Sequence, residues 1–154
     1  KGTEPGVWHG VQSAEVLEVW PDGVRVSAIA EGQFALVSGE RREVSNSLHE
    51  GLKLTARLTD MLLYDIPNVR LPYVQVDIYS TYRDADTTSQ RCIMSTRAER
   101  DIANDLDWDE MQPAEIVEAF GGRFAMDDRG NALPIEVDAP ARNSVPAAFY
   151  SDDV

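Results

Sequence analysis

Carboxylates are the residues most able to do chemistry in this chain, and they stand in well-separated segments. Glu50 falls near the start of an expected helix, Asp77 falls in an expected strand, and Glu99 follows a further strand. Carboxylate oxygens can hold a divalent cation, which polarises a phosphoryl group and activates water. These three residues are the candidate catalytic set for a metal-dependent hydrolase.

The order of these carboxylates resembles that in metal-dependent nucleases of the restriction-endonuclease type, which hold a divalent ion beside the scissile phosphate. The resemblance implies a phosphodiesterase or nuclease-like activity that uses Asp77 and Glu99, with Glu50 beside them. That family's motif places Asp and then Glu-x-Lys on neighbouring strands. Here Arg100 follows Glu99, no lysine stands near, and the capping pattern Thr96-x-x-Glu99 predicts a helix start instead.

Familiar motifs for other chemistries are missing from the sequence. Phosphate-binding glycine loops, H-E-x-x-H, C-x-x-C and G-x-S-x-G do not occur. A single cysteine, Cys92, allows no disulfide within the chain. The acidic segments 101–110 and 127–131 lack the order of a calcium-binding EF-hand loop, so we interpret them as solvated loops. We predict no metal and no cofactor.

The charge of the chain argues against a nucleic-acid partner. The 154 residues carry 27 acidic and 14 basic side chains, which gives a net charge of −13, and this field repels phosphate backbones. The basic set is almost all arginine, since Lys1 and Lys53 are the only lysines. A salt-adapted source and an arginine-biased, GC-rich genome both explain this composition.

The elements that must position these residues indicate an α+β domain over residues 1–137. We expect an antiparallel sheet of about five to seven strands, built from hairpins. Segments 13–20 and 24–30 form the clearest hairpin, because Pro21 favours the turn and Gly23 can adopt the positive φ that closes it. A third strand is expected at 34–37.

Three helices are predicted beside the sheet. The pattern Ser47-x-x-Glu50 is a capping box that begins a main helix over residues 48–65, with an apolar stripe wide enough to pack across the sheet. A short helix is expected to begin at the Thr96–Glu99 pattern. The third runs from Pro113 to Phe120 and ends at a glycine pair.

Alternation of apolar and polar residues predicts a half-exposed strand over residues 73–82, with a return strand at 91–94. Its outward face then carries Tyr73, Gln75, Asp77, Tyr79 and Thr81 to solvent, just as Arg25 and Ser27 should face water on the earlier hairpin. A last hairpin is expected from 124 to 137, turning at 127–131.

Aromatic residues in exposed places indicate a binding role. Tyr73, Tyr79 and Tyr82 are expected on the outward side of the sheet, and Phe149 and Tyr150 stand in an unpatterned C-terminal arm, residues 138–154. Large, stiff rings of this kind dominate binding hot spots.

The leading prediction is a non-enzymatic interaction or assembly module. It would be a structural subunit of a larger particle or a soluble domain of a membrane or secretion apparatus. Its partner would be another protein or a second copy, bound through the arm and the outer face of the sheet. No apolar run in the sequence is long enough to insert into a membrane.

Overall fold

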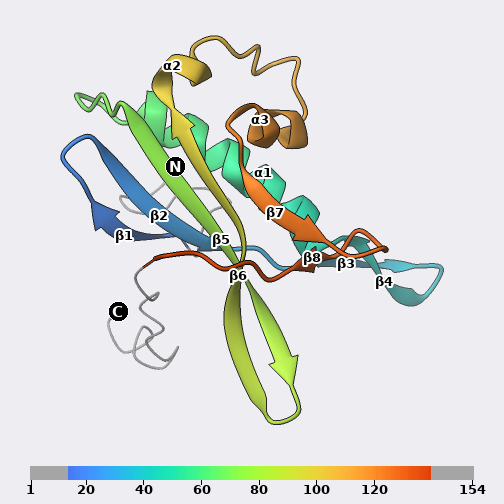
Figure 1. Ribbon diagram of the computed structural model, residues 1–154. Helices are drawn as coiled ribbons and strands as arrows, with labels where there is room; N and C mark the ends of the chain where they lie inside the picture. The colour runs from blue at the N-terminus through green and yellow to red at the C-terminus, as the bar shows by residue number, and fades with distance from the viewer. Residues whose placement is uncertain (1–13, 140–154) are drawn as a thin grey trace.

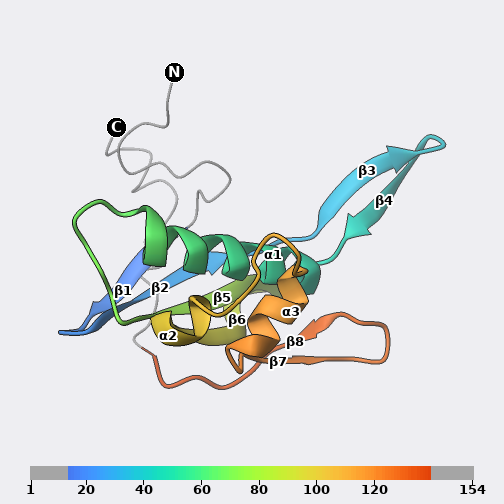
Figure 2. The ribbon, with the colours of Figure 1, turned by 90° about the horizontal axis from the view of Figure 1, so that it is seen from above.

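The computed structural model describes residues 14–139, which form one mixed sheet of six strands, three helices, and a two-stranded sheet that projects from the body (Figures 1 and 2). The strands of the main sheet are β1 (Glu15–Val19), β2 (Gly23–Ile29), β5 (Tyr73–Asp84), β6 (Thr87–Glu99), β7 (Arg123–Met126) and β8 (Ala132–Leu133). The projecting sheet pairs β3 (Gln33–Val37) with β4 (Glu40–Ser45). The helices are α1 (Ser47–Asp60), which continues as a π-helical turn, η1 (Met61–Asp65), and the shorter α2 (Arg100–Ala103) and α3 (Pro113–Ala119).

The α+β class is confirmed. The sheet was expected to be antiparallel throughout, but one pair of neighbouring strands is parallel. The sheet order is β1-β2-β5-β6-β7-β8, and β2 runs parallel to β5 while the other neighbours are antiparallel. Parallel neighbours need a crossover connection, and α1 provides it by carrying the chain back along one face of the sheet (Figure 2).

The main helix is where the sequence places it, but its cap differs. Asn46 is the N-cap, and its Oδ1 accepts a hydrogen bond from the backbone N–H of His49 at 2.8 Å. Ser47 is therefore the first helical residue and not the cap. Glu50 does not turn back to the backbone; its carboxylate accepts a hydrogen bond from the hydroxyl of Ser45.

The first hairpin is confirmed as β1 and β2, but Gly23 serves it in a different way. Glycines with positive φ in residues 14–139 are Gly39, Gly121 and Gly130, so Gly23 does not supply a left-handed turn. A Cβ at Gly23 would lie 2.6 Å from the carbonyl oxygen of Tyr73 on the parallel neighbour β5. The glycine is needed for this close approach of two backbones.

The helix predicted to start at Thr96 is wrong at its beginning, because β6 continues through this segment. Thr96 pairs with Val76 and Glu99 pairs with Tyr73 of β5, and α2 begins at Arg100. Pairing along a long strand therefore overrides the local capping pattern. Strand β4 was not predicted, because its Glu40-Arg41-Arg42-Glu43 run has no apolar alternation.

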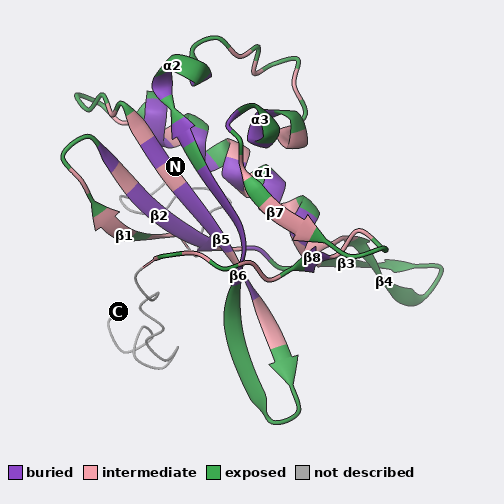
Figure 3. Cartoon of the chain, in the orientation of Figure 1, coloured by how far each residue is buried: buried purple, intermediate pink, exposed green. Residues whose placement is uncertain are grey.

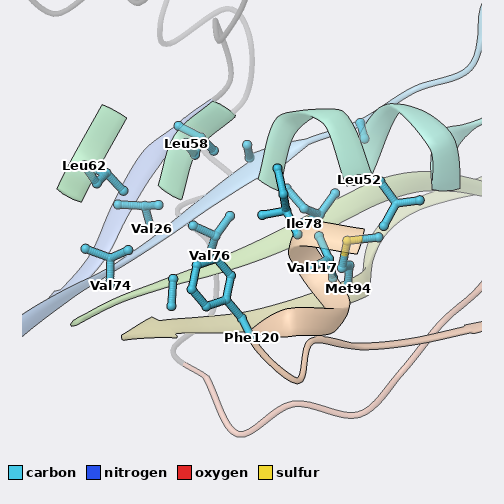
Figure 4. Close-up of a cluster of buried hydrophobic side chains, with 14 of the residues drawn as sticks. Val26, Leu52, Leu58, Leu62, Val74, Val76, Ile78, Met94, Val117 and Phe120 are labelled. Carbon is cyan, nitrogen blue, oxygen red and sulfur yellow. The ribbon is translucent and has the colours of Figure 1, made fainter. Parts of the chain in front are cut away.

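The hydrophobic core lies between α1 and the sheet (Figure 4). Leu52, Leu58 and Leu62 face down from the helical segment toward the inward side chains of the strands. The strands contribute Val26, Val74, Val76, Ile78 and Met94 to this cluster, and Val117 of α3 and the C-cap residue Phe120 close it. Close packing of this layer fixes the sheet against its crossover helix.

The second face of the sheet is also covered, contrary to the expectation that it meets solvent. Residues 134–139 cross it on the side opposite α1 (Figures 1 and 2). The backbone N–H of Ile135 donates to the carbonyl of Cys92 on β6 at 2.8 Å, and Nη1 of Arg25 on β2 donates to the carbonyl of Asp138 at 2.9 Å. Arg25, Ser27 and Asp77 are accordingly buried, with 6, 0 and 0% of their surface exposed.

Within residues 14–139, no helix has the length and apolar character needed to cross a membrane.

Candidate functional site

Asp77, the central residue of the predicted carboxylate set, lies in a buried polar network on the second face of the sheet. Its Oδ2 accepts a hydrogen bond from Nε of Arg25 at 2.7 Å, and its Oδ1 accepts one from the hydroxyl of Ser95 at 2.7 Å. Gln75 donates to the same Ser95 oxygen at 3.2 Å, and Glu18 lies 3.6 Å from Nη1 of Arg25. The carboxylate is neutralised and hydrogen-bonded by side chains of the protein, as a buried charge requires.

The structure does not bring the three predicted carboxylates together. Asp77 lies opposite Ser95 on β6, whereas Glu99 is four residues further along that strand and is exposed. Glu50 is on α1, which covers the other face of the sheet. Within the described part of the chain, no group of three or more His, Cys, Asp or Glu side chains could hold a metal ion.

Glu50 has a structural role in place of the predicted catalytic one. Partial burial raises the pKa of its carboxyl group, but hydrogen bonds from Ser45 and Lys53 outweigh burial and hold it below its ordinary value. Nζ of Lys53 lies 3.2 Å from Oε2 of Glu50. The carboxylate therefore ties the end of β4 to the first turn of α1, where a negative charge also stabilises the helix dipole.

The three tyrosines predicted to bind a partner occupy different surroundings. Tyr73 is half-buried. Its ring centroid lies 5.7 Å from that of the Trp20 indole, and the guanidinium of Arg97 lies 3.7 Å from the centroid of the Tyr73 ring. Tyr79 is half-buried on the same strand. Tyr82 packs against the core cluster and donates from its hydroxyl to the carbonyl of Ala132 at 3.2 Å, so it does not share the outward face.

The C-terminal arm was predicted over residues 138–154. Its aromatic pair, Phe149 and Tyr150, lies outside the residues that the structure describes. Asp138 belongs to the described part, where its carbonyl accepts the hydrogen bond from Arg25. The binding role of the arm stays a prediction.

The projecting hairpin of β3 and β4 is exposed along most of its length (Figure 3), and several of its exposed residues are apolar. Every residue of β3 is exposed. Leu36 has 77% of its surface accessible, Val44 59% and Phe34 48%. The guanidinium of Arg41 lies 4.2 Å over the ring of Phe34. The sequence marks residues 34–37 as a strand, but it gives no signal that this strand leaves the main sheet.

The pKa of the Cys92 thiol argues against nucleophilic chemistry by this residue. Burial raises that pKa to about 11, although the backbone of Met94 accepts a hydrogen bond from the thiol. A thiol with such a pKa is protonated near neutral pH, so Cys92 is not an activated nucleophile.

No known protein family, curated protein or solved structure matches this chain.

Proposed function

We propose that this protein is an assembly module that self-associates through the β3–β4 hairpin. The observation that supports the proposal is a two-stranded sheet, projecting from the body, that exposes Phe34, Leu36 and Val37 along one strand. A two-stranded hairpin is marginally stable in water unless something packs against it or extends it. A surface of this kind is a site for another chain.

The two edges of the hairpin differ in a way that selects one of them. β4 carries two glutamates and two arginines, which obstruct the pairing of a further strand, whereas β3 reads Gln-Phe-Ala-Leu-Val without a charge or a proline. Natural sheets protect their edges with charges, prolines or bulges. The one register shift of the hairpin places an extra residue, Val44, in β4 between the partners of Gln33 and Phe34, so the bulge belongs to β4 and the edge of β3 is regular.

A second copy of β3 has the chemistry that this edge favours. Antiparallel pairing of two β3 strands centred on Ala35 places Phe34 of each copy opposite Leu36 of the other. Aromatic and aliphatic side chains in such pairs stabilise a sheet by about 0.2–1 kcal/mol per pair. Phe34 and Leu36 point to the same face of β3, since their cross-strand partners are Glu43 and Arg41.

Charge also favours contact at this place over contact between the bodies. The chain carries −13, whereas Glu40, Arg41, Arg42 and Glu43 cancel within the hairpin. Because the hairpin extends away from the body (Figure 2), association at its edge keeps the two acidic bodies apart. Salt screening then weakens the remaining repulsion.

Sedimentation velocity over about a hundredfold range of protein concentration tests the proposal, because self-association depends on concentration. The unmodified protein is expected to shift from monomer toward dimer as concentration rises. Leu36→Lys places a charge on the β3 edge and should keep the protein monomeric. The matched control is Val44→Lys, which makes the same change on β4, where charges already stand, and should still dimerise.

Three outcomes would contradict self-association through β3. These are a monomer at every concentration, a dimer that Leu36→Lys leaves intact, and a complex that requires a different protein. The circular dichroism of Leu36→Lys must match that of the unmodified protein, which separates loss of association from loss of fold. A truncated chain that ends at Ala139 tests the C-terminal arm in the same experiment, and it should still dimerise if β3 is the contact.

A further inference from the structure

Helix α2 lies at the end of the sheet opposite the hairpin (Figure 2), and its Arg100 is buried without an ionic partner among residues 14–139. It is the first residue of α2, and 6% of its surface is exposed. Its Nε donates to the carbonyl of Leu71 at 2.8 Å, and its backbone N–H donates to the carbonyl of Pro72 at 2.8 Å. These two bonds attach the loop after η1 to the end of β6.

The guanidinium of Arg100 is otherwise poorly satisfied. Nη2 is buried with no hydrogen-bond partner, and within residues 14–139 no carboxylate forms an ion pair with this side chain. The ring of Tyr64 lies 5.4 Å from its central carbon and gives a weak cation–π contact. A buried charge that lacks a counterion destabilises the folded protein, so an anion bound beside this guanidinium would be stabilised by it.

A cavity of about 500 Å³ adjoins this side chain. Its lining includes a second arginine, Arg70, and two less polar residues, Pro72 and Tyr73. Glu99 and Asp101 complete the lining. The volume is in the range of small-molecule sites, which are mostly apolar with a few convergent polar groups.

We propose that this cavity binds a small carboxylic acid with an aromatic or aliphatic body, with its carboxylate held by Arg100 and Arg70. Guanidinium groups match the planar geometry of a carboxylate. The body of the ligand lies against Pro72 and Tyr73. Glu99 and Asp101 at the same cavity, in a chain of net charge −13, oppose a doubly charged phosphate more than a singly charged carboxylate.

Benzoate is a suitable probe because it joins one carboxylate to one ring. In ¹H–¹⁵N spectra of the whole chain, the Nε–H signal of Arg100 reports directly on the group that donates to Leu71. Benzoate added at constant ionic strength should shift this signal in a saturable way. Sodium chloride at the same ionic strength should not do so, and phosphate should bind at least about tenfold more weakly.

Arg70→Gln is the deciding variant, because Arg70 is exposed and its loss should leave the fold intact. It should weaken benzoate binding by about tenfold or more, as removal of a charged hydrogen bond does. Arg129→Gln makes the same change on the remote 127–131 turn and should alter binding by less than about twofold. Arg100→Met removes the guanidinium and should abolish binding.

Several results would overturn this proposal. They are the absence of a saturable shift with benzoate, tighter binding of phosphate than of benzoate, and equal weakening by Arg70→Gln and Arg129→Gln. Should Arg100→Met fail to fold, the comparison of Arg70→Gln with Arg129→Gln still decides the question. None of these measurements depends on self-association through the hairpin.

Discussion

Among single residues, Asp77 shows how a side chain with catalytic potential becomes part of the scaffold. It sits in the middle of β5, fully buried, with Arg25 on one carboxylate oxygen and Ser95 on the other. Arg25 in turn donates to the carbonyl of Asp138. The ion pair therefore connects two parallel strands with the segment that crosses them.

Replacing Asp77 by Asn is expected to destabilise the protein by about 3 kcal/mol, because buried Arg25 then loses its close, fully buried counterion and keeps only the more distant, partly exposed Glu18. Urea unfolding followed by circular dichroism measures the change. Asp84→Asn, at the exposed tip of the same strand, should change stability by less than about 0.5 kcal/mol. A loss below about 1 kcal/mol for Asp77→Asn would show that water replaces the ion pair.

Cys92 should be chemically protected in the folded protein. It is 5% exposed, and burial raises the pKa of its thiol to about 11, so thiolate is scarce at pH 8. We expect labelling by a thiol reagent to be on the order of a hundredfold slower than in denaturant, since reaction requires a local opening. Rapid labelling of the native protein would contradict the burial of this residue.

The same thiol pKa predicts how the free energy of unfolding changes at alkaline pH. Because the thiol pKa is higher in the folded protein than its ordinary value of 9.0, the unfolded chain loses this proton first as pH rises. The stabilisation is complete below about pH 9 and declines between about pH 9 and pH 11. Cys92→Ala should lose less stability than the unmodified protein over that interval, as measured by thermal unfolding.

At the scale of elements, the start of α1 is where three parts of the chain meet. Asn46 accepts a hydrogen bond from the N–H of His49 and donates from Nδ2 to the carbonyl of Gly130 at 3.0 Å. The first bond caps α1, and the second connects it to the turn between β7 and β8. The projecting hairpin ends one residue before this cap.

Asn46→Ala removes both bonds and is expected to cost about 1–2 kcal/mol. Asn46→Asp keeps the acceptor that caps the helix but loses the amide donor, so it should cost less than the alanine variant. Chemical denaturation of the two variants separates the contributions. Equal losses would mean that the link to Gly130, and not the cap, carries the stabilisation.

The elements themselves could largely be read from the sequence, because periodicity is a local property. Residues 73–82 alternate as a strand, and the apolar stripe of 48–65 marks a helix that the structure confirms. The sequence of a strand does not show which of its faces is covered, because the covering residues can lie far away in the sequence. Asp77 and Arg25 look solvent-facing in sequence, and residues 134–139 bury them.

The candidate sites were predicted less well for the same reason. Tyr73 and Tyr82 are separated by an odd number of positions, so a regular strand places them on opposite faces. The hairpin and the Arg100 cavity depend on features that no local pattern reports. One is a strand that leaves the main sheet, and the other is a buried guanidinium without a counterion.

For the whole molecule, the net charge of −13 is the dominant electrostatic fact. Loss of hydration raises the pKa of Asp60, and the nearby charges of Asp65 and Asp109 raise it further. A carboxyl group whose pKa is raised by folding binds its proton more tightly in the folded state than in the unfolded state. Its contribution to stability therefore falls as pH rises above its ordinary value of 3.8.

Added KCl should raise the melting temperature at pH 7 by screening this repulsion. Asp60→Asn should raise it at low salt, and this gain should shrink as KCl increases. Differential scanning calorimetry measures both effects. A melting temperature that falls steadily with KCl would contradict the repulsion argument, and it would also remove a salt-adapted source as the explanation of the composition.

The parallel pairing of β2 with β5 has a consequence for how the chain reaches this structure. The β1–β2 and β5–β6 hairpins each close locally, but Gly23 must meet Tyr73 across about fifty intervening residues before the sheet exists as one piece. Closing so long a loop lowers the conformational entropy of the chain before the contacts between β2 and β5 can stabilise it. We therefore infer that the docking of α1 against both hairpins, rather than the formation of either hairpin, sets the folding rate.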